Sequence, residues 1–237
     1  MDIRWLGHSC FELSDGEARV LIDPFLKPHS PTAPLTAGEV EPTHILLSHG
    51  HADHLADAVP VATRTGAPCV AIVELAKWLD ARGVAETFDP NLGGVVEFDW
   101  GWVKLVQAFH TNTTPGEGDE PFSAETGTSI GVPAGLVVNI GGATIYHAGD
   151  TCLFGDMKLI GERTPLDVAI VPIGGHYTMG VDDAAYACGL LGAGTVLPMH
   201  YNTFPVIEAD PMEFKRKVES GCDARVVVLE PGDTHSI

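Results

Sequence analysis

Four potential metal ligands occur within six consecutive residues of the sequence: His49, His51, Asp53 and His54. An apolar run at 45–47 directly precedes them and predicts a buried strand. Polar residues that follow such a strand lie at the carboxyl edge of the sheet, where α/β proteins bind ligands. Imidazole and carboxylate groups suit zinc, manganese or iron. One tetrahedral ion could not take all four groups from so short a segment, so we expect the segment to serve two ions.

The same arrangement recurs at three later strand ends. Apolar segments at 105–109, 143–147 and 196–199 lead into His110, Asp150 and His200, respectively. A single histidine after a strand is commonplace, whereas ligand-type residues at several strand ends indicate one shared site. The alternative for positions 49–54, an exposed polar turn, is disfavoured because three histidines and an aspartate follow a buried strand.

Short strands and helices must position these residues. Apolar patterning and turn residues predict strands at 3–6, 10–13, 20–22, 44–48, 69–73, 95–98, 103–109, 129–132, 136–140, 144–146, 168–172, 195–198 and 226–229. Helices are expected at 56–65, 74–82, 182–191 and 211–220. The order divides into two similar halves, which predicts two sheets packed face to face with helices outside, within a single α/β domain spanning residues 1–237.

Together these residues resemble the metallo-β-lactamase superfamily over essentially the whole chain. The superfamily's His-x-His-x-Asp-His signature matches positions 49–54, and its later ligands match His110, Asp150 and His200. An aspartate at the end of an early strand matches Asp23. More narrowly, the segments 6–9, 147–151, 172–180 and 198–203 resemble the UPF0173-like metal-dependent hydrolases related to ascorbate-phosphate lactonases.

The resemblance implies a four-layer αββα sandwich with two divalent metal ions at one edge. One ion would be held by His49, His51 and His110, and the other by Asp53, His54 and His200. Asp150 and a hydroxide would bridge the ions, which would acidify the shared water and polarise the attacked bond. Asp53 would also take part in proton handling. Asp23 would orient a ligand histidine, or alternatively cap a turn before Pro24.

Two positions separate the branches of the superfamily. Di-iron redox relatives commonly carry glutamate where this chain has His51, so His51 favours hydrolysis. Antibiotic-degrading relatives often replace the bridging carboxylate by cysteine, and here Asp150 is present with Cys152 two residues away. A β-lactamase role is therefore disfavoured.

Three further histidines are candidates for contact with substrate. His8 follows Gly7 in a turn and could act as an acid or as an oxyanion donor, and His176 follows two glycines in a turn that could bring it near the metals. His147 precedes the bridging aspartate. A hydrogen-bonded structural role is the alternative for each, and it is the expected one for His29, His44 and His235.

Two loops adjoin these residues. Asn202 and Thr203 follow a ligand and either contact substrate or form a turn. The polar segment from Thr111 to Gly127 is expected to be either a lid or a disordered loop.

The composition limits the classes of partner that the protein is expected to bind. The chain has 13 Lys and Arg against 32 Asp and Glu, a net charge of −19, which repels nucleic acid and anionic lipid. It lacks an apolar run long enough to span a bilayer and a signal-peptide pattern at its start, so we expect a cytoplasmic protein. Five widely spaced cysteines without a CxxC pair predict small buried or half-buried thiols rather than disulfides.

The leading hypothesis is a hydrolase that cleaves an ester, lactone or related bond of a small metabolite, with zinc as the expected metal and manganese or iron as alternatives. The second is a phosphodiesterase or nuclease on the same scaffold, and the third is a non-catalytic metal-binding sensor. The partner is expected to be a small molecule, and a homo-oligomer is compatible with this class of enzyme.

Overall fold

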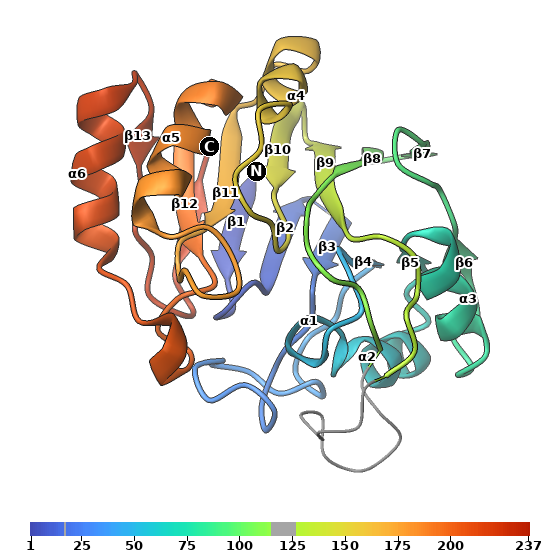
Figure 1. Cartoon of the computed structure of the whole chain (residues 1–237). Coiled ribbons are helices and arrows are strands. Elements are labelled where there is room, and N and C mark those ends of the chain that lie inside the picture. Colours follow the sequence, from blue (N-terminus) through green and yellow to red (C-terminus); the bar gives the residue numbers. More distant parts are fainter. Residues whose placement is uncertain (17, 115–126) are drawn as a thin grey trace.

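A computed structural model describes residues 1–16, 18–114 and 127–237. Two seven-stranded sheets lie at its centre, and helices lie beside them (Figure 1). The first sheet has the order β14-β1-β2-β3-β4-β5-β6. Its strands are β1 (Asp2–Trp5), β2 (Phe11–Asp15), β3 (Ala18–Ile22), β4 (His44–Leu46), β5 (Cys69–Val70), β6 (Thr87–Phe88) and β14 (Thr234–Ser236).

The second sheet has the order β13-β12-β11-β10-β9-β8-β7. Its strands are β7 (Val95–Phe98), β8 (Gly101–Gln107), β9 (Ala134–Ile140), β10 (Ala143–His147), β11 (Val168–Pro172), β12 (Thr195–Met199) and β13 (Arg225–Val226). In each sheet the pairs at one end are antiparallel and those at the other end are parallel, as between β8 and β9 and between β11 and β12, respectively. The two halves of the chain therefore build sheets of the same design.

The helices are α1 (Ala52–Leu55), α2 (Ala58–Thr65), α3 (Val73–Asp80), α4 (Met157–Arg163), α5 (Val181–Leu191) and α6 (Pro211–Gly221), with a 3-10 turn at Pro205–Ile207. Helix α5 packs against β11, and α6 packs against β13. The buried residues of α5 are Ala184, Ala187, Cys188 and Leu191, which lie on one helical face. Strand β11 is buried along its whole length, as expected for a parallel strand covered on both faces.

The prediction of two face-to-face sheets flanked by helices is confirmed, and most strands lie within a few residues of their predicted places. The strand predicted at 129–132 is wrong, because Ser129 forms only an isolated bridge with Thr113. Strands β6 and β14 and helix α4 were not predicted; the two strands have only two and three residues, too few for a period to be visible. The prediction of a lid falls mostly on residues 115–126, which lie outside the described residues.

Three features bear on the expectations from composition. Apolar side chains from both sheets form a continuous core. Cys10, Cys69 and Cys188 are buried free thiols, whereas Cys152 is exposed. In the described part of the chain, no helix has the length and apolar character needed to cross a membrane.

Candidate metal centre

The centre lies where loops from the two sheets meet. The backbone N–H of His200, after β12, donates to the carbonyl of His8 in the β1–β2 loop at 3.1 Å. Likewise, the N–H of Ala134 at the start of β9 donates to the carbonyl of Ser48 at 2.9 Å. These bonds join ligand-bearing loops that are far apart in the sequence.

His49, His51 and His110 form the three-histidine group. Nε2 of His49 and Nδ1 of His51 are 3.0 Å apart, and Nε2 of His110 is 3.2 Å from the same Nδ1. Thr151 aligns the strand ends that carry His110 and Asp150, because its Oγ1 accepts the N–H of Phe109 at 3.0 Å. One nitrogen from each ring therefore converges on a common point.

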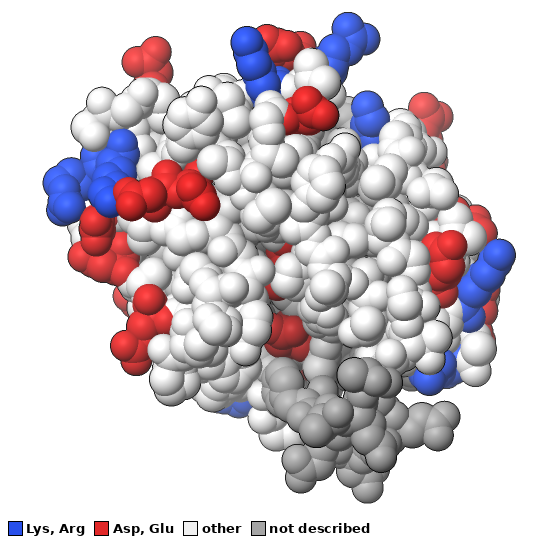
Figure 2. Space-filling model, in the orientation of Figure 1, with Lys and Arg blue, Asp and Glu red and all other residues white. Residues whose placement is uncertain are grey.

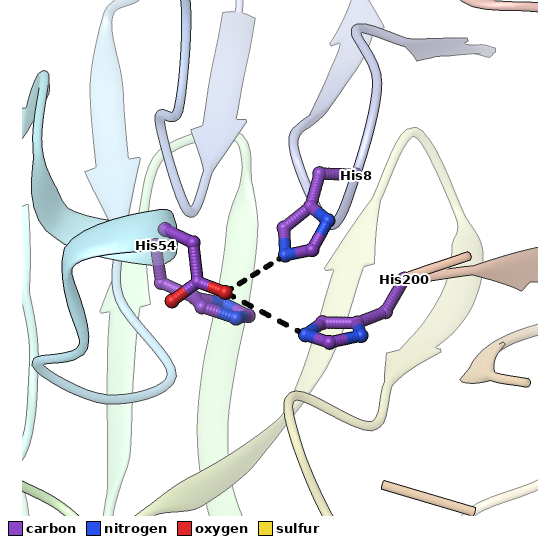
Figure 3. A group of neighbouring side chains, drawn as sticks. His8, His54 and His200 are labelled. Atoms are coloured by element: carbon purple, nitrogen blue, oxygen red, sulfur yellow. Dashed lines mark hydrogen bonds and ion pairs between the residues drawn. The ribbon is translucent and has the colours of Figure 1, made fainter. Parts of the chain in front are cut away.

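Asp53, His54 and His200 form the mixed group, which His8 adjoins (Figure 3). Nε2 of His200 lies 3.7 Å from Oδ2 of Asp53, and Nε2 of His8 lies 3.0 Å from the same oxygen. Figure 3 shows His8 and His200 pointing from separate loops toward the carboxylate beside His54. His8, His54 and His200 are almost completely buried.

Asp150 lies between the two groups. Its Oδ1 is 3.3 Å from Nε2 of His54, and its Oδ2 is 3.1 Å from Nε2 of His200. The same Oδ2 is 3.6 Å from Nε2 of His110 and 4.0 Å from Nε2 of His49. One carboxylate thus faces all but one of the surrounding histidine ligands, and both groups at once.

The donor set fits divalent metal ions. Two donors bound to one zinc ion at about 2.1 Å and a tetrahedral angle lie about 3.4 Å apart, close to the separations in both groups. Within the described residues, Nε2 of His54, both ring nitrogens of His200 and Oδ1 of Asp150 are buried without a hydrogen bond. Unpaired buried polar atoms of this kind are costly, and a cation between them would remove that cost.

The electrostatics of the two groups differ. Burial lowers the pKa of His49 well below its ordinary value, that of His51 to about 4, and that of His110 as well. Burial acts in the same direction on His200, but Asp150 and Asp53 outweigh it and raise the pKa of His200 to about 9. The three-histidine group is therefore neutral at neutral pH and ready to donate lone pairs, since ligating imidazoles must be unprotonated.

In the mixed group, protonated histidines and ionised carboxylates stabilise one another. Burial alone would lower the pKa of His54, but Asp150 and Asp23 raise it well above its ordinary value. Burial would raise the pKa of Asp150, yet His200 and His54 hold it well below its ordinary value. A metal ion binding here would replace protons as the partner of these carboxylates.

Asp23 orients His54. Its Oδ2 accepts a hydrogen bond from Nδ1 of His54 at 2.7 Å, which leaves Nε2 facing Asp150. Its Oδ1 accepts the backbone N–H of Ser48 at 2.8 Å, so it also fixes the start of the ligand segment. Asp23 is fully buried and has a left-handed backbone with φ 46°. Of the two roles considered from the sequence, these contacts correspond to the orienting one.

The other histidines fall into distinct environments. His147 is buried, and its Nε2–H donates to the carbonyl of Ser9 at 3.0 Å while its Nδ1 accepts from Gly149, a structural arrangement. His176 is exposed on the loop after β11, and its ring packs edge-on against Tyr177. Its predicted catalytic role stays a prediction, since no described contact joins it to the centre. His29 pairs with Asp57, and His44 packs against Trp100.

The two polar residues that follow closely after His200 have different roles. Oδ1 of Asn202 accepts the N–H of Ala209 at 2.9 Å and closes a turn. Oγ1 of Thr203 lies 2.8 Å from Nδ1 of His8. Thr203 therefore connects to Asp53 through His8, while Asn202 shapes the loop.

Asn112 was missed by sequence reasoning. Its Oδ1 accepts the N–H of Gly50 at 2.9 Å, and its Nδ2 donates to the carbonyls of Ile130 and Val132. A Cβ at Gly50 would lie 2.3 Å from Cδ1 of Ile130, so any larger residue between His49 and His51 would displace the Ile130 side chain. The only signal in the sequence for this role was the position of the asparagine, two residues after the ligand His110.

Comparison with known proteins agrees with this geometry. A model of the β-lactamase superfamily domain matches residues 2–200. A UPF0173 metal-dependent hydrolase of Desulfitobacterium hafniense is 45% identical over 241 residues, covering 99% of this chain and 98% of that protein. One of Methanopyrus kandleri is 44% identical over 236 residues, covering 99% of both.

Among solved structures, Igni18, described as a novel metallo hydrolase from the hyperthermophilic archaeon Ignicoccus hospitalis, is 37% identical. Its TM-score is 0.86, and the match covers 99% of this chain and 97% of that one. The fold and the resemblance predicted from the motifs are thereby confirmed. The chain belongs to the β-lactamase superfamily and, within it, to the UPF0173 metal-dependent hydrolases.

Proposed function

We propose that the centre binds two divalent ions and hydrolyses an ester, lactone or related bond of a small molecule. The observation that supports this most directly is the position of Asp150, which lies 3.3 Å from His54 and 3.1 Å from His200 of the mixed group and 3.6 Å from His110 of the three-histidine group. A buried carboxylate between two sets of imidazoles suits a pair of ions better than one.

In this proposal His49, His51 and His110 hold one ion, Asp53, His54 and His200 hold the other, and Asp150 contacts both. We propose zinc, since imidazole and carboxylate donors at these separations suit it, with manganese and iron as alternatives. Bound ions would acidify a shared water and polarise the oxygen of the bond under attack.

The residues around the ions have separate tasks. Hydrolysis joins the water oxygen to the acyl carbon, breaks the bond to the leaving oxygen and delivers one water proton to that oxygen. The Asp53 side chain is the most exposed carboxylate of the centre, at 19%, and so is the group best placed to carry this proton. The Nε2–H of His8 donates to Oδ2 of Asp53 and holds its carboxylate in place.

A small molecule is the proposed partner, and nucleic acid is not, because the net charge of −19 opposes a polyanion. A phosphodiesterase or nuclease and a non-catalytic sensor are the competing functions. A homo-oligomer and a cytoplasmic location stay predictions.

Metal analysis and a hydrolysis panel test the proposal together. The purified protein should contain close to two transition-metal ions per chain and should hydrolyse esters or lactones when reconstituted with zinc, manganese or iron. Phosphodiesters should react more slowly. A protein that binds at most one ion contradicts the dinuclear centre. Turnover of phosphodiesters alone favours the competing enzyme, and stabilisation by a metabolite without any turnover favours the sensor.

A further inference from the structure

Basic residues are absent from the parts of the chain that build the centre. Residues 5–18, 28–63, 105–157 and 164–214 contain no Lys or Arg, and these stretches include His8 and all seven proposed ligands. All 13 Lys and Arg belong to the described residues, because position 17 and residues 115–126 contain none. The structure therefore places every Lys and Arg side chain relative to the centre.

The basic side chains that form ion pairs do so elsewhere. Arg64 pairs with Glu41, and Lys217 pairs with Asp182 and Glu213 on the surface of α5 and α6. Within the described part of the chain, no Lys or Arg forms a hydrogen bond or ion pair with a residue of either ligand group. Figure 2 shows Lys and Arg around the edge of one face and acidic side chains in the furrow at its middle.

An open hollow adjoins the mixed group. It has a volume of about 670 Å³ and is lined by residues 202–205 and 208–210. Thr203, in its wall, lies 2.8 Å from the His8 ring, which connects the hollow to the centre. The charged residues of the wall are Glu208 and Asp210, both exposed. A substrate that reached from the centre into this hollow would meet this acidic wall.

The first residues of helix α6 offer no substitute for a basic side chain beside the hollow. Helix α6 begins beside the hollow at Pro211, which lacks an N–H. The next N–H, of Met212, already donates to the Asp210 carboxylate at 2.8 Å. The positive end of this helix is therefore satisfied by the chain's own carboxylate and closed to an external anion.

We propose that the substrate is neutral or cationic beyond the bond that is cleaved, and that it carries no phosphate or other anionic group there. This inference rests on the proposed function, because it assumes that the reacting bond lies at the metal centre. Phosphate recognition normally relies on Arg, Lys or free N–H groups, and the wall contains no Lys or Arg. A distal phosphate would meet Glu208 and Asp210, whereas a neutral or ammonium group would not be repelled.

Three hydroxamates of equal length test the charge preference without turnover. Butyrohydroxamate is neutral, succinic acid monohydroxamate is anionic and 4-aminobutyrohydroxamate is cationic, and each binds metal through the same group. Calorimetric titration of the metal-loaded protein at low salt should show the anionic compound binding about tenfold more weakly than the neutral one, from one nearby unit charge. The difference in affinity between the anionic and the neutral compound should become smaller in 0.5 M salt, because charges are then screened within roughly a few ångströms.

Three variants locate the effect. Glu208→Lys should strengthen binding of the anionic hydroxamate severalfold, whereas Glu97→Lys on the distant edge strand β7 is the matched control and should change nothing. Lys27 is four residues from Asp23 in sequence, and its ammonium lies 3.5 Å from the carbonyl of Pro34. Lys27→Ala should leave the order of the three compounds unchanged.

The outcomes separate this inference from the proposed function. Equal or tighter binding of the anionic compound overturns the charge preference, and loss of that binding in Lys27→Ala would identify Lys27 as an anion partner. An unchanged order in Glu208→Lys overturns the assignment of the acidic wall. Failure of 4-nitrophenyl esters to react while the hydroxamates bind in the expected order contradicts ester hydrolysis only. Failure of all three to bind overturns both proposals.

Discussion

The three-histidine group and the mixed group differ in what holds their side chains. Nδ1 of His49 is 2.9 Å from the Ser48 hydroxyl, and Nε2 of His51 is 3.3 Å from the Thr111 hydroxyl. Among the described residues, the side-chain partners of His110 are other members of the centre. In the mixed group Asp23 fixes His54, and His8 fixes Asp53. The outer partners of the mixed group are therefore a buried carboxylate and a buried imidazole, whereas those of the three-histidine group are the hydroxyls of Ser48 and Thr111.

Asp150→Asn should have the largest effect, because it removes a negative charge shared by both groups. We expect loss of bound metal from both groups and a fall in hydrolysis of at least about a hundredfold, the upper end of what an outer partner of a ligand contributes. Metal content by mass spectrometry and ester turnover measure this. Asp156→Asn, an exposed residue without a side-chain cap bond, is the control. Loss of metal from only one of the two groups would show that Asp150 does not bridge the two ions.

Asp23→Asn should damage the mixed group alone. The amide can still contact Ser48, but it cannot act as a charged acceptor for Nδ1 of His54. We expect the affinity of the mixed-group ion to fall by about 10- to 100-fold, while the three-histidine ion is retained. Stepwise cobalt titration followed by visible absorption separates the two ions. Parallel loss of both would contradict independent construction of the groups.

The pH dependence of metal binding should distinguish the groups next. His200 has a pKa raised to about 9, so a metal ion must displace a proton there at neutral pH, and its affinity should rise as the pH rises toward 9. His51, with a pKa of about 4, is already unprotonated above pH 5. Calorimetry at pH 6, 7 and 8 should thus show one ion gaining up to about tenfold in affinity per pH unit and the other little changed. Identical pH slopes for both ions would remove this distinction.

Thr203→Val should have the smallest effect. It leaves the His8 ring without the 2.8 Å partner that fixes its orientation. Asp53 then loses part of the support that it receives from the His8 ring. We expect turnover to fall severalfold with the metal content unchanged, and Thr203→Ser to retain the wild-type rate. A loss of metal in Thr203→Val would instead mean that His8 contributes to holding the ion.

Much of the fold and the ligand positions could be predicted from the sequence because they depend on short patterns. The apolar run before His49 and the strand ends before His110 and His200 carry their own signal. The supporting contacts could not be predicted, because Asn112 acts on a backbone N–H that comes close only when the two sheets pack, and Thr151 acts on one that follows another strand of its own sheet. Likewise, the strand predicted at 129–132 has the right composition but pairs at one residue only.

The backbone at the centre bears on how this protein can change. Outside glycine, the described residues with left-handed φ are His8, Asp23, His176, His200 and Asn202, and three of these lie within the centre. Each such residue costs about 1 kcal/mol that glycine would not. Glycine at His8, Asp23 or His200 would relieve this backbone cost, but it would leave a cavity where each of these side chains is now buried. The contacts around the centre therefore hold these three residues in a conformation that their backbone disfavours, as is common where side chains are placed for chemistry.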